Sequence, residues 1–159
     1  MSTLIRGTLH GVLAGAAGTT VLNAVTYADM AVRGRPASST PGDTVEALAA
    51  KTGVPVPGAG EERDNRIAGL GPLLGIAAGV GAGALLGIAM GIGWRPGPAS
   101  AIVAASAAAL LAGNAPMTLL GVTDPREWPA SAWVADIVPH VAYGVAAAAV
   151  LRRRSAFSA

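Results

Sequence analysis

The chain alternates between long apolar stretches and short polar segments, and no charged residue occurs from Gly7 to Ala28 or from Ile67 to Trp94. A helix of about 20 apolar residues crosses a hydrocarbon core roughly 30 Å thick. Lipid offers no hydrogen-bonding partner, so a crossing segment satisfies its own backbone by becoming a helix. The pattern therefore predicts an all-α, polytopic membrane protein, a single domain of residues 1–159 with transmembrane helices at about 7–31, 67–94, 98–122 and 129–151.

Glycine recurs at every fourth position through the second predicted span, at Gly71, Gly75, Gly79, Gly83, Gly87 and Gly91. Residues four apart form one ridge on a helix, and a ridge without side chains allows a second backbone to approach closely. In water each glycine would cost a helix about 1 kcal/mol relative to alanine. We therefore expect glycine-ridge packing between membrane helices, and a second row of small residues on the third span extends this expectation: Ala101, Ala105, Ala109 and Gly113.

The segment 32–66 between the first two spans is polar. Pro41 and Asp43 suit the first turn of a helix, so we expect a short surface helix at about 41–52. Two interpretations stay open for it, a helix resting on the membrane surface and a lid or docking element over the bundle. The first span also has an alternative, because Arg6 followed by an apolar run is typical of a signal peptide.

Composition supports a membrane location, since 13% of the residues are charged and 52% are hydrophobic, against about 25% charged in soluble domains. The formal net charge of +2 does not indicate a nucleic-acid partner, because the basic residues are scattered and the excess lies in the run Arg152 to Arg154. The chain has no cysteine, which excludes disulfides, thiolate nucleophiles and cysteine metal sites. The partner that we expect is the lipid bilayer.

Charge also bears on orientation. With four spans, five arginines lie on the side of both termini: Arg6, Arg95, Arg152, Arg153 and Arg154. The other side has six basic residues: Arg33, Arg35, Lys51, Arg63, Arg66 and Arg126. This count is nearly balanced, but all acidic residues outside the fourth span lie on the long-loop side. We therefore expect a multi-pass protein of the plasma membrane with cytoplasmic termini.

Four polar residues inside the predicted spans form a candidate functional cluster. Asp136 and His140 are four apart on the fourth span and so share one face. Asn114 and Asn23 lie on the third and first spans; with His140 they are about 12 to 17 Å from the long-loop side at a rise of 1.5 Å per residue. Ionisable groups within a span are rare and indicate function. The alternative is structural, with the asparagines bonding helices together and the Asp136–His140 pair serving packing alone.

Other chemistry finds little support in the sequence. One histidine and one carboxylate are too few to hold a metal, and His10 is expected near the opposite face of the membrane. The run Gly79-x-Gly81-x-Gly83 lies within a span rather than between a strand and a helix, so it cannot cradle a phosphate. No nucleophile and base are paired. We therefore expect no cofactor, no metal and no catalytic residue.

Three segments carry a resemblance to a known group of proteins: Gly15 to Thr20 with Asn23, Gly34 to Ser39, and Asn65-Arg66 leading into Gly71 to Gly75. In these segments the chain resembles the small four-helix integral membrane proteins of uncharacterised function common in actinobacteria. The resemblance covers most of the chain. It implies a membrane location and no particular activity.

Two functional hypotheses follow from the sequence, and a third is weaker. The first is an accessory or packing subunit that forms a homo-oligomer or joins a larger membrane complex through its glycine ridge. The second is a small permease or proton-coupled carrier that uses Asp136 and His140, with Asn114 and Asn23 lining a polar cavity. The third is a membrane-embedded enzyme acting on a lipid.

Overall fold

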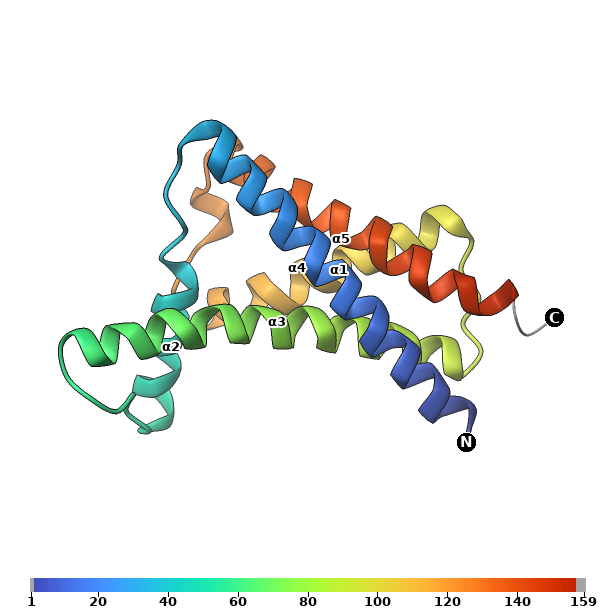
Figure 1. Ribbon diagram of the computed structural model, residues 1–159, viewed down its shortest axis with the longest axis horizontal. Coiled ribbons are helices and arrows are strands. Elements are labelled where there is room, and N and C mark those ends of the chain that lie inside the picture. Colours follow the sequence, from blue (N-terminus) through green and yellow to red (C-terminus); the bar gives the residue numbers. More distant parts are fainter. Residues whose placement is uncertain (1, 157–159) are drawn as a thin grey trace.

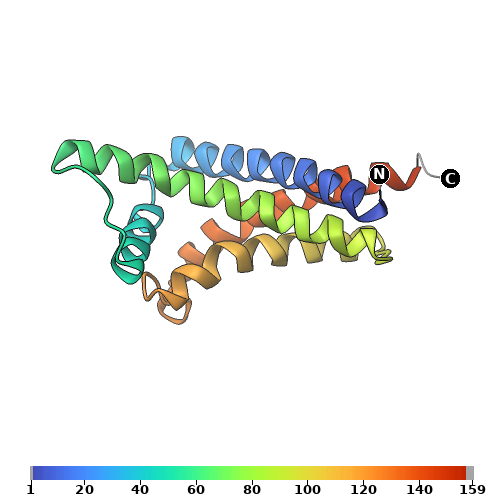
Figure 2. The same cartoon turned by 90° about the horizontal axis from the view of Figure 1, so that it is seen from below.

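The computed structural model describes residues 2–156, with side chains described as far as Arg153. These residues form five α-helices and one short 3-10 helix, and the part of the chain described contains no strand: α1 (Thr3–Arg33), α2 (Thr40–Thr52), α3 (Glu61–Gly91), α4 (Pro98–Leu119), η1 (Pro125–Glu127) and α5 (Ala130–Ala156). The expected all-α class is confirmed. The four long helices run alongside one another, and α2 crosses them at one end (Figures 1 and 2).

Among the described residues, three helices are long and apolar enough to cross a membrane: α3, α4 and the part of α5 from Ala130 to Arg153. Helix α1 has 31 residues, as many as α3, but it is less apolar because it contains His10, Asn23 and five threonines. The fold is therefore that of a helical protein suited to a membrane. A count of four spans is not established by these properties.

Helix α3 begins at Glu61, six residues before the expected span at 67. Its first turn contains three acidic residues, which favour the positive end of the helix dipole. The Arg66 guanidinium lies 2.7 Å from the Glu62 carboxylate one turn away, an arrangement that supports an exposed helix. A charged extension of α3 therefore projects beyond the neighbouring end of α1 (Figure 2).

Helix α2 is bound to the first half of α3. Thr44 and Val45 of α2 are buried, and the Arg63 guanidinium of α3 lies 2.7 Å from the Glu46 carboxylate of α2. A Cβ atom at Gly71 would lie 2.9 Å from the Cβ atom of Pro41, so the missing side chain makes room for the start of α2. The short helix is thus held on α3, which leaves both interpretations of its role open.

The α1–α3 interface consists of glycine backbone from both helices. Gly7, Gly11 and Gly15 of α1 face Gly87, Gly83 and Gly79 of α3 in antiparallel order. A Cβ atom added at Gly11 would lie 2.9 Å from the Cα atoms of Ala84 and Gly87, closer than real Cβ atoms approach backbone. The helices cross at these glycines and diverge toward the long-loop end (Figure 1).

Tyr143 is the one large side chain that is fully buried among the described residues, at 0% exposure. Its hydroxyl donates a hydrogen bond of 2.6 Å to the Gly79 carbonyl of α3. A Cβ atom at Gly18 of α1 would lie 2.6 Å from the Tyr143 ring. Tyr143 therefore joins α5 to α1 and α3 at the point where the glycine interface ends.

Candidate functional site

The polar residues predicted to cluster come together between α4 and α5. The Asn114 amide donates a hydrogen bond of 2.7 Å from Nδ2 to Oδ2 of Asp136. The His140 Nδ1 atom lies 3.5 Å from the other Asp136 carboxylate oxygen, Oδ1. The side chains of Asn114, Asp136 and His140 therefore form one connected polar cluster.

The hairpin between α4 and α5 sets the depth of this cluster. Asn114 lies five residues before the end of α4 and Asp136 six residues after the start of α5. Each is therefore about one and a half turns from the same end of the bundle. Gly144 allows the two helices to approach closely, since a Cβ atom there would lie 2.7 Å from the Ile102 carbonyl oxygen. The short connection and the missing side chain together bring the amide to the carboxylate.

The imidazole of His140 is oriented by its own helix. Its Nδ1 atom lies 2.7 Å from the backbone carbonyl oxygen of Asp136, which can only accept, so this geometry assigns the proton of the neutral ring to Nδ1. Nε2 is then the acceptor, and it lies on the side of α4, where a Cβ atom at Gly113 would be 3.8 Å away. A proton arriving at His140 would be received at Nε2.

The side chains of the cluster are mostly buried but keep some contact with the surface. The Asp136 side chain is 19% exposed and the His140 side chain 14%. The Asn114 amide donates a hydrogen bond to one carboxylate oxygen of Asp136, and the imidazole of His140 lies beside the other. The arrangement therefore places a carboxylate and an imidazole, two side chains that can each bind a proton, next to one another between α4 and α5.

Asn23, the fourth residue of the predicted cluster, lies on α1 and is half-buried. None of the hydrogen bonds described for residues 2–153 joins it to the other three.

The six glycines predicted to pack against another helix do not all contact the same helix. Gly79, Gly83, Gly87 and Gly91 lie against α1, Gly71 lies against α2, and Gly75 has no atom within 4 Å of an added Cβ atom.

A metal site does not form in the described part of the chain, where no three side chains of the histidine, cysteine, aspartate or glutamate type come together. The Asp136–His140 pair therefore lacks a third ligand among these residues.

Neither Tyr143 nor Gly18 was predicted to be a site residue or a packing residue. Tyr143 lies three residues after His140 on the same stripe of α5, so its position was visible. Its role was not, because nothing in the sequence indicates that its hydroxyl reaches α3. Gly18 lies outside the α1 row of Gly7, Gly11 and Gly15, so a spacing of four does not reveal it either.

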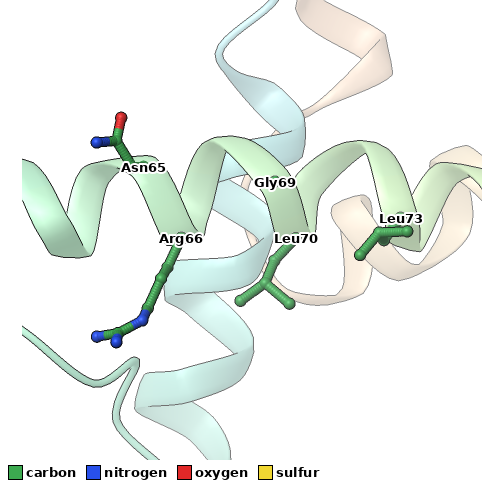
Figure 3. A pocket seen from close by; sticks show the side chains of 5 residues that line it. All are labelled: Asn65, Arg66, Gly69, Leu70 and Leu73. Atoms are coloured by element: carbon green, nitrogen blue, oxygen red, sulfur yellow. The ribbon is translucent and has the colours of Figure 1, made fainter.

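The surface of the protein also has two hollows. The first is a shallow depression of about 290 Å³ along one face of α3, lined by Asn65, Arg66, Gly69, Leu70 and Leu73 (Figure 3). The second is a groove of about 220 Å³ between α1 and α5, lined by Val25, Asp29, Arg33, Val134, Ala135, Val138 and Pro139. Only the groove between α1 and α5 is built by two helices, and it is more enclosed.

Comparison with known proteins gives no match: no protein-family profile, curated protein or solved structure is significantly similar to this chain. The class of the protein therefore rests on its fold, an all-helical chain with three helices suited to span a membrane.

Proposed function

We propose that this protein spans the plasma membrane four times, through α1, α3, α4 and α5, with both termini in the cytoplasm. The observation that supports α1 as a span is its glycine interface with α3. Gly7, Gly11 and Gly15 touch backbone of α3, which is itself apolar enough to cross. A cleaved signal peptide would remove this helix from the bundle and expose the glycine ridge of α3.

Cysteine labelling tests this topology well, since the native chain has no cysteine. Ser2→Cys and Ser38→Cys flank α1, and Ala16→Cys lies on its exposed face near the middle. A membrane-impermeant maleimide applied to intact cells should label Ser38→Cys alone. Ser2→Cys should require lysed cells, and Ala16→Cys should stay unlabelled in both. Labelling of Ser2→Cys and Ser38→Cys from the same side would reject α1 as a span.

Within this membrane protein, the role that the geometry supports best is a small permease or proton-coupled carrier, without catalytic chemistry. The observation that carries this proposal is the connected cluster of Asn114, Asp136 and His140. Two side chains that can each bind a proton lie one turn apart on α5, and the amide from the neighbouring helix donates a hydrogen bond to the carboxylate. Such groups inside a span often mark proton relays.

The glycine ridge supports the accessory role less than its sequence suggested. Gly79, Gly83, Gly87 and Gly91 are covered by α1 of the same chain, so this ridge is not free for a second protein. The small row on α4 is also used within the chain, since Ala101, Ala105 and Ala109 are buried. The close-packing surface that motivated self-association is thus largely consumed by folding.

Proton flux into liposomes tests the carrier role. Purified protein is reconstituted with a pH-sensitive dye inside the vesicles, and a potassium diffusion potential drives uptake. We expect Asp136→Asn to abolish uptake, because an amide cannot exchange a proton, while the thermal midpoint in detergent stays near that of the native protein. Asp124→Asn is the matched control in the α4–α5 turn and should leave uptake unchanged. Uptake that survives Asp136→Asn would remove the carboxylate from the mechanism.

An accessory subunit is the second candidate, and an exposed row on α3 favours it. Gly69, Leu73, Ala77, Gly81 and Leu85 are spaced four apart and all exposed, and a Cβ atom at Gly69 or Gly81 would meet nothing within 4 Å. A second helix can approach this row closely. Gly81→Leu should then convert an oligomer to a monomer in cross-linking, whereas Gly75→Leu should not. An oligomer unchanged by Gly81→Leu counts against this face.

A further inference from the structure

The groove between α1 and α5 combines an apolar wall with a charged mouth. Val25 of α1 and Val138 and Pro139 of α5 line one end, and Asp29 and Arg33 of α1 line the other. Arg33 lies eight residues after Val25, or about 12 Å along the helix axis. The groove therefore runs along α1 and α5, away from the end of the bundle that carries the long loop.

Asp29 and Arg33 line the mouth, and Arg35, which does not line the groove, pairs with Asp29 beside it, so the three side chains leave an excess of one positive charge. The Arg33 guanidinium lies 2.7 Å from the Asp29 carboxylate, and the Arg35 Nε atom lies 2.5 Å from the same carboxylate. One carboxylate neutralises one guanidinium, so the second charge is not compensated within the trio. Arginine presents a fork of N–H donors that matches phosphate oxygens.

This local excess differs from the rest of the long-loop side. Eight acidic residues lie on that side of the predicted spans against six basic ones, which makes the side acidic as a whole. A positive site there is therefore a local feature of the groove mouth, and a general attraction of this surface for anions does not account for it.

The surroundings of the groove determine which kind of molecule can fill it. In a bilayer the apolar wall faces acyl chains, which fill any hollow between two spans. The charge at the mouth then selects among lipids by their headgroups, since anionic headgroups are attracted to arginine near the membrane surface. We infer that the groove between α1 and α5 is a binding site for one anionic phospholipid, its chain against Val25 and Val138 and its phosphate at Arg33 and Arg35. The inference rests on the proposed placement of α1 in the bilayer and is independent of the carrier role.

Lipid retention measures this site directly. Protein in a mild detergent is mixed with phosphatidylglycerol, with phosphatidylcholine of the same chains, or with inorganic phosphate, and the lipids retained are counted by native mass spectrometry. One phosphatidylglycerol should be retained about fivefold more tightly than phosphatidylcholine, as expected from about 1 kcal/mol for one arginine near the headgroup. Inorganic phosphate should not compete, because it lacks the chain that fills the groove.

Two variants separate the headgroup from the chain. Arg35→Gln leaves the Arg33–Asp29 pair intact and removes the excess charge, so the fivefold preference should vanish while a lipid is still retained. Val138→Trp fills the groove and should reduce retention of both lipids by tenfold or more. Val145→Trp is the matched control, because Val138 is 51% and Val145 50% exposed on α5 and only Val138 lines the groove.

Several outcomes would overturn the site. Equal retention of the two lipids rejects headgroup recognition, and equal loss for Val138→Trp and Val145→Trp rejects the groove. Competition by inorganic phosphate would mean that the site binds an anion without needing an acyl chain, which rejects the lipid site. If no lipid preference is found but proton uptake persists, only the lipid site is rejected. If the lipid preference is found but proton uptake is absent, only the carrier proposal is rejected.

Discussion

The two ends of the bundle are joined by different physical means. At the end nearer the termini, α1 and α3 meet through bare glycine backbone, with Gly11 and Gly15 against Gly83 and Gly79. Toward the long-loop end α1 and α3 diverge (Figure 1), and α4 and α5 are linked there by a hydrogen bond of 2.7 Å between Asn114 and Asp136. We call the α1–α3 glycine interface the glycine joint and the Asn114–Asp136 contact the polar joint. Close backbone packing holds the glycine joint together, and a hydrogen bond contributes to the polar joint.

This difference suggests which end can change shape. Backbone packed on backbone has a single good arrangement, since no side chain can rotate to relieve a clash. A partly exposed amide, carboxylate and imidazole have rotatable side chains, so their hydrogen bonds can rearrange without moving the backbone. We therefore expect the glycine joint to act as a fixed pivot and the polar joint to be the adjustable one, with Tyr143 at the boundary.

The largest effect is expected at the centre of the glycine joint. In Gly83→Ala the new Cβ atom would lie 2.5 Å from the Gly11 carbonyl oxygen and the Gly15 amide nitrogen of α1. Both neighbours are backbone, so the helices must separate. We expect a loss of about 3 kcal/mol or more in unfolding free energy, the upper part of the range for overpacking. Unfolding by sodium dodecyl sulfate in mixed micelles measures it.

Gly75→Ala is the control for this substitution. It lies on the same ridge two turns away, yet a Cβ atom there meets nothing within 4 Å. Alanine also favours the helix by up to about 1 kcal/mol over glycine. The variant should be as stable as the native protein or slightly more so. Equal losses at positions 75 and 83 would mean that helix propensity, and not contact with α1, sets the effect.

The sequence was sufficient for the fold class but not for the division of its glycines. Uncharged apolar stretches indicated helices, because that depends on composition over many residues. The ridge from Gly71 to Gly91 looked uniform, and the spacing of four could not tell which glycines contact α1, which contact α2 and which stay exposed. That assignment depends on the angle between helices, which local sequence does not encode.

The candidate site divides in a similar way. Asp136 and His140 share a helix face by spacing alone, and Asn114 joins them because the α4–α5 hairpin is short, which the sequence also displayed. Asn23 was expected at a depth similar to that of Asn114 and His140. Depth along a helix does not determine which neighbour a side chain faces, because that depends on the rotation of the helix about its axis. The Tyr143 hydroxyl reaches 64 residues back to Gly79, a contact that no short-range pattern reveals.

A smaller effect is expected at the polar joint. Asn114→Leu removes the donor to the Asp136 carboxylate and leaves a partly buried acceptor without it, which costs about 2 kcal/mol. Asn114→Leu combined with Asp136→Leu removes both polar groups and should recover most of that loss. A double-mutant cycle in mixed micelles gives the coupling between the two side chains. A coupling near zero would mean that the hydrogen bond does not hold α4 to α5.

Removing one hydroxyl at the boundary should cost less. Tyr143→Phe keeps the ring against Gly18 and deletes only the hydrogen bond to the Gly79 carbonyl. Interhelical bonds of this kind contribute about 0.6 to 2 kcal/mol, so we expect a loss of about 1 kcal/mol. Tyr27→Phe is the matched control, because Tyr27 is 60% exposed and should show no change. Equal stability of the two variants would assign the role of Tyr143 to its ring alone.

The smallest effect concerns the α4–α5 turn, which lies next to the polar joint and outside the spans. The guanidinium and backbone N–H of Arg126 both donate to Asp124 and lower the pKa of its carboxyl from 3.8 to about 2. Because the pKa is lower in the folded protein, the ion pair stabilises the turn above pH 4 and loses this effect as the pH falls toward 2. The thermal midpoint of the native protein should therefore slightly exceed that of Asp124→Asn at pH 6, and the two should converge below pH 2. A gap that stays unchanged well below pH 2 would mean that the aspartate acts through its shape as a cap and not through its charge.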